Sequence, residues 1–304
     1  MTDTALAPFL AHVDWISIPA TVHPSWLACN LRVRSANASA NTNGQALVLK
    51  ELPQRCQGWI DPQALIRATS AAANAGLGPA TVHADEALGA LVQQALPNGS
   101  LPLTFARLAR SRLGDYLELH RRLMSLNVEL PRRAVHETIA RLNDELHRLG
   151  APIPQRLLEA LDQVPRIVDA LRGGPAPRIG WGDGNVGNVM IQPDGSLCML
   201  GGTAAGCMDP LQNVGAVVSE LCPFVVAEEF VVDALWHGAD RQARARISLY
   251  AILEDVRAAT WAAYSEQIEG AASGEYRSFV GVRTHKALRR TRAAEFAQLL
   301  SAAA

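Results

Sequence analysis

A glycine-rich segment near the middle of the chain constrains the fold more than any other feature. It reads Ile-Gly-Trp-Gly-Asp-Gly-Asn-Val-Gly-Asn-Val-Met-Ile over residues 179–191 and places Asp183 and Asn188 five positions apart. Apolar runs then flank a Pro-Asp-Gly-Ser turn at residues 193–196. Apolar runs around a turn rich in Asp and Gly predict a β-hairpin. The segment is therefore expected to form a loop with polar side chains that leads directly into a hairpin.

The residues before this segment predict a mixture of strands and helix. Asp61 and Pro62 supply the cap and the first residue of a helix that is expected to run to about residue 75. Short runs with strand character are rich in β-branched and other apolar residues and are bounded by turn residues. They lie at residues 31–34, 46–50, 80–82 and 88–92.

Beyond residue 100 the apolar pattern becomes mainly helical. Apolar residues recur at helical spacing over residues 134–149 and again over 155–172, and the pattern is mostly helical from residue 213 onward. We therefore expect an α+β protein of two lobes. The predicted boundaries are 1–95 for a small sheet-plus-helix lobe and 96–304 for a helical lobe that includes the loop and hairpin at about 179–210.

Composition limits the class of partner. The 304 residues carry a net charge of −1 and a pI of about 6.7, which predicts neither a nucleic-acid-binding surface nor a strongly polarised one. The basic stretch Arg283–Arg292 is interpreted as a solvated helix face. A small-molecule ligand is expected, with no nucleic-acid partner.

The cysteines and the apolar runs predict a location. Five cysteines lie far apart with no C-x-x-C pair, which disfavours a zinc site or a disulfide framework and suits a reducing cytosol. No signal peptide is evident, and charges interrupt the apolar stretches before they reach membrane-spanning length. The sequence thus predicts a cytoplasmic protein with no membrane partner.

The central segment and several flanking stretches resemble a known superfamily. Asp183 to Asn188 resembles the H-G-D-x-x-x-x-N catalytic loop of choline, ethanolamine and aminoglycoside kinases. Other stretches are similar to elements of the same family, in the same order along the chain: Val48-Leu49-Lys50, residues 66–79, Gly206–Pro210 and Asp255–Trp261. The resemblance implies the two-lobed fold of the protein kinases.

The resemblance also implies roles for individual residues. Asp183 would accept the proton of the substrate hydroxyl, Lys50 would hold the phosphates of ATP, and Asn188 would help to hold Mg²⁺. Trp261 and Asp255 are candidates for the substrate side, where an aromatic cage would bind a quaternary ammonium. The implied activity is transfer of the ATP γ-phosphate to a hydroxyl of choline, ethanolamine, an aminoglycoside or a similar molecule.

Three departures from the family pattern affect the nucleotide side. Gly201 stands where the family has a magnesium-binding Asp, and glycine offers no side-chain oxygen to a hard cation. His23–Asn30 replaces the glycine-rich phosphate loop. The candidate positions for the glutamate that would pair with the lysine hold Gln63 and Leu65.

Two hypotheses remain open from the sequence. In the first, the protein is an ATP- and Mg²⁺-dependent kinase in which Asp194, Asp209 or Glu220 replaces the acid missing at Gly201. In the second, it is a pseudokinase that binds a small molecule or a protein partner and needs no cofactor. A pseudokinase should tolerate loss of Asp183, whereas a kinase should not.

Overall fold

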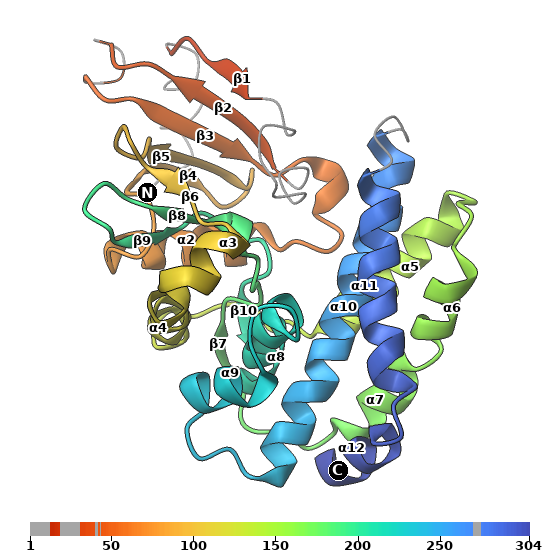
Figure 1. Ribbon diagram of the computed structural model, residues 1–304. Helices are drawn as coiled ribbons and strands as arrows, with labels where there is room; N and C mark the ends of the chain where they lie inside the picture. Colours follow the sequence, from red (N-terminus) through yellow and green to blue (C-terminus); the bar gives the residue numbers. More distant parts are fainter. Residues whose placement is uncertain (1–12, 19–30, 40–41, 43, 270–274) are drawn as a thin grey trace. The chain divides into compact units, whose positions relative to one another are not determined.

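The computed structural model describes residues 13–18, 31–39, 42, 44–269 and 275–304 (Figure 1). His23–Asn30, the stretch that replaces the family's phosphate loop, lies outside the described residues. The chain forms two compact units. The first holds the residues up to Pro131 together with Asn185–Cys207, and the second holds Arg132–Gly184 together with Met208–Ala304. In the described part of the chain, every helix is too short or too polar to cross a membrane.

An antiparallel sheet of five strands forms the upper part of the first unit in Figure 1, in the order β1-β2-β3-β5-β4. The central strand β3 pairs with β2 through Val33 opposite Lys50, and with β5 through Leu49 opposite Val92. Leu49 and Val92 are fully buried in the core of the sheet. The four predicted strands are confirmed, with ends shifted by one to three residues. The strands are β1 (Ile16–Ile18), β2 (Arg32–Ala36), β3 (Leu47–Glu51), β4 (Thr81–Asp85) and β5 (Ala90–Gln94).

The helix predicted after Asp61 is confirmed as α2 (Pro62–Asn74). The Asp61 carboxylate accepts a hydrogen bond of 2.9 Å from the backbone N–H of Ala64, and Pro62 occupies the first turn, where no N–H is needed. The predicted hairpin is also confirmed. Its strands β8 (Val189–Ile191) and β9 (Leu197–Met199) join β6 (Leu101–Pro102) in a three-stranded sheet.

The hairpin belongs to the first unit because it is bonded to residues of that unit. The backbone N–H of Met199 donates to the carbonyl of Leu77 at 2.7 Å, just beyond α2. A further helical segment of the same unit contacts β9. It consists of α3 (Phe105–Arg107), η6 (Leu108–Arg112) and α4 (Leu113–Met124), of which α4 makes the contact. A separate short turn, η5 (Gln54–Cys56), lies between β3 and α2 in the chain.

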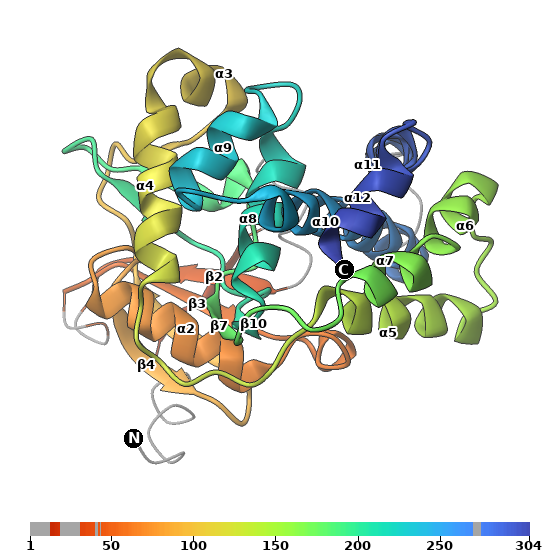
Figure 2. The ribbon, with the colours of Figure 1, turned by 90° about the horizontal axis from the view of Figure 1, so that it is seen from below.

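The second unit is mainly helical, as predicted, and is built around one long helix. That helix, α10, runs alongside α5 and α11 (Figures 1 and 2) and also packs against α8 and α12. Its middle is buried on nearly every side, which is typical of a helix at the centre of a domain. The helices are α5 (Val135–Arg148), α6 (Gln155–Leu161), α7 (Val164–Ala170), α8 (Pro210–Leu221), α9 (Glu228–Leu235), α10 (Arg241–Glu269), α11 (Glu275–Thr291) and α12 (Phe296–Ala303).

The prediction of a single helix over residues 155–172 is wrong. The chain forms α6, which ends at Leu161, and α7, which begins at Val164. Pro165 lies in the first turn of α7 and has no N–H to donate to the carbonyl of Leu161, so α6 cannot continue through it. The apolar spacing correctly predicted helix on both sides of the break, but it does not indicate the break itself.

Candidate functional site

Lys50 and Asn188 lie in the same unit and are linked through one residue. The Lys50 ammonium on β3 donates to the backbone carbonyl of Leu200 at 2.8 Å. The N–H of Leu200 donates in turn to the carbonyl of Asn188 at 2.7 Å. Asn188 ends a short 3₁₀ turn, η7 (Val186–Asn188), directly before β8. The hairpin thus brings together two of the residues that the sequence assigned to phosphate and metal.

The Lys50 ammonium is buried, and its hydrogen-bond partner is a backbone carbonyl. Burial lowers the pKa of Lys50 from its ordinary value to about 8, so the side chain stays mostly protonated at neutral pH. Among the described residues, no carboxylate forms an ion pair with it. The partner of the cation is instead a carbonyl dipole, that of Leu200. A lysine held in this way retains a charge that can attract a phosphate.

Helix α2 approaches the turn after the hairpin with a threonine and a leucine. A Cβ atom placed on Gly202 would lie 2.5 Å from the Thr69 hydroxyl oxygen and 3.4 Å from the Leu65 side chain. The Thr69 hydroxyl is buried without a hydrogen-bond partner. Gln63, the other candidate position on this helix, is exposed. The side chains of α2 nearest to Gly202 therefore carry no acid.

The residues of the first unit do not fit a conventional magnesium site. Magnesium on nucleotide phosphates requires oxygen ligands, usually carboxylates. Gly201 and Gly202 supply none from their side chains, and within the described residues no group of three or more His, Cys, Asp or Glu is arranged to hold a metal ion. Asp194, one proposed substitute, is a turn residue that accepts hydrogen bonds from the N–H and hydroxyl of Ser196.

Asp183 lies in the second unit, on a loop that α8 supports. The N–H of Gly182, a residue with a φ of 63°, donates to the Asn213 side-chain oxygen at 2.8 Å. On the other side of Asp183, a Cβ atom at Gly184 would lie 2.5 Å from the carbonyl of Ala216, so only glycine fits there. The two contacts fix the loop at both ends of Asp183, whose exposed fraction is 7%. The sequence places the candidate base on a loop whose backbone is fixed on both sides.

The residue before this loop is a tryptophan that packs in the interior. Trp181 follows β7 (Arg178–Gly180) and is 1% exposed. The strand β7 pairs with β10 (Gly206–Met208). A Cβ atom on Gly180 would lie 2.6 Å from the sulfur of Met208, which shows how closely the two strands pack. Trp181 therefore supports the loop from inside the unit.

The two other acids proposed to replace the missing one have structural partners. Asp209 caps α8 by accepting from the N–H of Leu211 at 2.9 Å, and its second oxygen accepts from Tyr250 at 2.9 Å and from Arg246 at 3.1 Å. Glu220 forms an ion pair with Arg283. Both carboxylates are thus already neutralised by cations or hydrogen bonds of the second unit.

The predicted substrate residues, Asp255 and Trp261, lie in the interior of the second unit on α10. Asp255 is fully buried, and one of its oxygens accepts from the Ser219 hydroxyl at 2.9 Å and from Arg283 at 3.1 Å. Trp261 is 1% exposed and meets the rings of Tyr276 and Phe279 edge-on. Their assignment to substrate binding stays a prediction.

The interpretation of Arg283–Arg292 as a solvated face is wrong for three of its cations. Arg283 and Lys286 are turned inward toward Asp255, and Arg290 forms an ion pair with Glu228 at 2.8 Å. The three positions are spaced by three and four residues and therefore share one face of α11. This spacing was the signal in the sequence that could have identified them.

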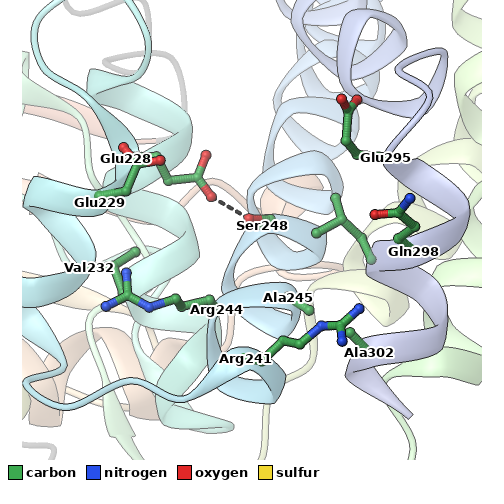
Figure 3. A pocket seen from close by; sticks show the side chains of 11 residues that line it. Glu228, Glu229, Val232, Arg241, Arg244, Ala245, Ser248, Glu295, Gln298 and Ala302 are labelled. Carbon is green, nitrogen blue, oxygen red and sulfur yellow. Dashed lines mark hydrogen bonds between the residues drawn. The ribbon is translucent and has the colours of Figure 1, made fainter.

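A pocket of about 730 Å³ lies elsewhere in the second unit (Figure 3). Charges of both signs face it, and several already have partners: Ser248 donates to Glu228, and Arg244 pairs with Asp233. None of the residues predicted to act on phosphate or substrate lines it. The lining residues are Glu228, Glu229, Val232, Arg241, Arg244, Ala245, Ser248, Glu295, Gln298, Leu299 and Ala302.

Comparison with known proteins gives matches in structure but not in sequence. No protein-family model matches the chain, and no curated protein matches it significantly. A choline/ethanolamine kinase family protein from Mesorhizobium loti is similar in structure, with a TM-score of 0.71 and 19% identity over 97% of this chain and 95% of the other. The choline kinase LicA from Streptococcus pneumoniae gives a TM-score of 0.69 and 15% identity over 93% and 95%.

The similarity extends to enzymes that modify antibiotics. A macrolide 2'-phosphotransferase type I matches with a TM-score of 0.54 and 15% identity over 94% of this chain and 97% of the other. The chain therefore has the fold shared by choline/ethanolamine kinases and the aminoglycoside and macrolide phosphotransferases, which confirms the predicted α+β kinase-like fold. Among these neighbours, LicA has been solved with AMP, and the amicoumacin kinase hAmiN with AMP-PNP and Ca²⁺.

Proposed function

We propose that this protein uses the small-molecule phosphotransferase fold to bind a ligand and does not carry out conventional magnesium-dependent phosphate transfer. One observation carries the proposal: the Lys50 ammonium is bonded to the carbonyl of Leu200, and two glycines follow where a metal-binding acid would be needed. A kinase relies on metal ions to neutralise the charge that develops during transfer. Gly201 and Gly202 offer no carboxylate for that task, and the described residues of the first unit form no metal-binding group in its place.

The ligand proposed for this unit is a nucleotide. Lys50 carries a positive charge whose partner is a dipole, so an anionic phosphate is a stronger partner than the one it has. Asn188 is joined to the same hydrogen-bonded chain through its backbone. We expect phosphate binding at Lys50 that does not depend on a divalent cation.

The second candidate function is phosphate transfer from ATP to a small-molecule hydroxyl. It is favoured by Asp183, which lies in a loop fixed by Asn213 and by the close contact of Gly184 with α8. In that case Asp183 would accept the hydroxyl proton as the phosphate is transferred. The substrate would be a small hydroxylated molecule, as the names of the structural neighbours suggest.

Restoring the missing acid separates the two candidates. ATP is titrated calorimetrically, with and without Mg²⁺, into the wild type, Gly201→Asp and the uncharged control Gly201→Asn. We expect binding to the wild type that Mg²⁺ does not strengthen. In Gly201→Asp, Mg²⁺ should tighten binding by about tenfold or more, since one added carboxylate ligand contributes at least ~1.4 kcal/mol. Gly201→Asn should behave like the wild type.

The outcome that contradicts the proposal is Mg²⁺-dependent ATP binding by the wild type, together with phosphate release or transfer that Asp183→Ala abolishes. That result would establish the second candidate and would require an acid other than residue 201 to hold the metal. Unchanged ATP binding in Lys50→Ala would contradict the assignment of the phosphate to Lys50.

A further inference from the structure

Three helices of the second unit enclose a cluster of buried charges. Helix α8 contributes Ser219 and Glu220, α10 contributes Asp255, and α11 contributes Arg283 and Lys286; α10 packs against both of the other helices (Figure 1). The two carboxylates and the two cations balance. Asp255 is fully buried, and the side chain of Arg283 is 13% exposed. The cluster therefore reaches the surface on the side of Arg283.

The guanidinium of Arg283 lies between carboxylates and an aromatic ring. It pairs with Glu220 and with Asp255 at 3.1 Å, and its central carbon lies 5.1 Å from the centre of the Phe279 ring. Phe279 packs edge-on against Trp261, with ring centres 6.4 Å apart. Carboxylates combined with an aromatic face are the surroundings in which proteins bind organic cations. Here a side chain of the protein itself supplies the cation.

The cluster lies one to two helical turns from the residues that hold the Asp183 loop. Asn213 and Ala216 of α8 contact the glycines on either side of Asp183. Ser219 and Glu220 follow Ala216 on the next turn of the same helix, a rise of about 5.4 Å, and lie almost two turns beyond Asn213. The carboxylate–aromatic surroundings of Arg283 are thus beside Asp183 within the same unit.

We propose that Arg283 is a tethered cation that fills a carboxylate–aromatic site beside the Asp183 loop and excludes choline-type ammonium ions from it. The site consists of Glu220, Asp255 and Phe279. The inference rests on the second candidate function only in that a substrate is taken to lie next to Asp183. It makes Arg283 a specificity determinant: the part of the ligand that approaches α11 is uncharged or anionic.

Removing the guanidinium tests the proposal directly. Choline and tetramethylammonium are titrated into the full-length wild type and Arg283→Ala, without nucleotide, and binding is measured calorimetrically. Arg283→Ala leaves Glu220 and Asp255 short of a cation and uncovers the Phe279 ring, at a position that opens to solvent. We expect it to bind both ions at least about tenfold more tightly than the wild type does. The added ion takes the place of the guanidinium between the carboxylates and the Phe279 ring.

Two variants control for charge and for shape. Arg277→Ala removes a cation from the same helix at an exposed position, where Arg277 pairs with Glu266, and should not gain affinity. Arg283→Lys keeps a cation between the carboxylates and should also bind no more tightly than the wild type. A gain in Arg277→Ala equal to that in Arg283→Ala would reduce the effect to net charge and overturn the proposal.

Loss of folding would not prevent the test. If Arg283→Ala is unfolded at the working temperature, its thermal unfolding is followed with increasing tetramethylammonium or methylguanidinium, and we expect the ions to raise its Tm but not that of the wild type. Absence of this rescue, a folded variant that binds neither ion, or wild-type affinity equal to that of the variant would each overturn the proposal. Because no nucleotide is present, failure of the Gly201→Asp experiment leaves this result unaffected.

Discussion

Each of the two units contains a buried cation, but the partners of the two cations differ. In the first unit, Lys50 has a backbone carbonyl as its partner and a pKa lowered to about 8 by burial. In the second, Arg283 lies between Glu220 and Asp255 and faces an aromatic ring. Burying a charge without an opposite charge costs free energy of folding. A buried charge that is paired costs less, but removing any one of its partners then destabilises the protein. Among the described residues, Lys50 therefore has a dipole as its partner, whereas Arg283 belongs to a balanced set of two carboxylates and two cations.

The largest effect should come from breaking the network of the second unit. Arg283→Ala leaves two largely buried carboxylates without their main cation, and we expect a loss of about 3–5 kcal/mol in the free energy of unfolding. Urea unfolding followed by circular dichroism measures it. The exposed Arg277→Ala variant should be nearly unchanged. Equal stabilities of the two variants would mean that the cluster contributes no more than a surface pair.

A smaller loss is expected where α8 holds the Asp183 loop. Asn213→Ala leaves the N–H of Gly182 without its acceptor in a buried position, which should cost about 1–3 kcal/mol in the free energy of unfolding. If Asn213→Ala were as stable as the wild type, the loop would not depend on this bond, and the contrast between a supported Asp183 and an isolated Lys50 would weaken.

The smallest effect at neutral pH is expected at Lys50. Lys50→Met removes one hydrogen bond but also the cost of burying a charge, so its free energy of unfolding at pH 7 should lie within about 1 kcal/mol of the wild-type value. The pH dependence is more informative. The folded-state pKa of about 8 lies below the unfolded value of 10.5, so between these pH values the unfolded chain binds more protons.

Wild-type stability should therefore rise relative to Lys50→Met as the pH increases from about 8 toward 10.5, with a slope of at most ~1.4 kcal/mol per pH unit. Parallel urea titrations of the two proteins across this range measure the difference. A constant difference would show that the pKa of Lys50 is not lowered.

Most of the regular elements followed from local signals. Asp61 and Pro62 predicted the start of α2, and the turn at residues 193–196 predicted the β8–β9 hairpin, because capping and turn formation depend on a few neighbouring residues. The break before α7 was missed although Pro165 was visible, because apolar spacing alone does not register a missing N–H.

The candidate site was predictable in residue type but not in surroundings. The spacing of Asp183 and Asn188 and the strand ending in Lys50 could be read directly, and the structure links Lys50 to Asn188 through Leu200. The threonine that faces Gly202 could not be foreseen, since which face of α2 approaches the turn depends on how the hairpin packs. Of the two positions named for a glutamate that would pair with Lys50, Leu65 lies beside Gly202 and Gln63 is exposed.

By itself, the sequence determined most of the strands, helices and turns, which residues carry a candidate carboxylate and a candidate cation, and that residue 201 has no side-chain oxygen. Only the tertiary structure decided which charges are buried and how they are paired. Arg283 meets Asp255 across 28 residues and Glu220 across 63, and Lys50 meets Leu200 across 150. The physical reason is that burial and ion pairing depend on segments brought together by folding, whereas helix and turn signals depend on immediate neighbours.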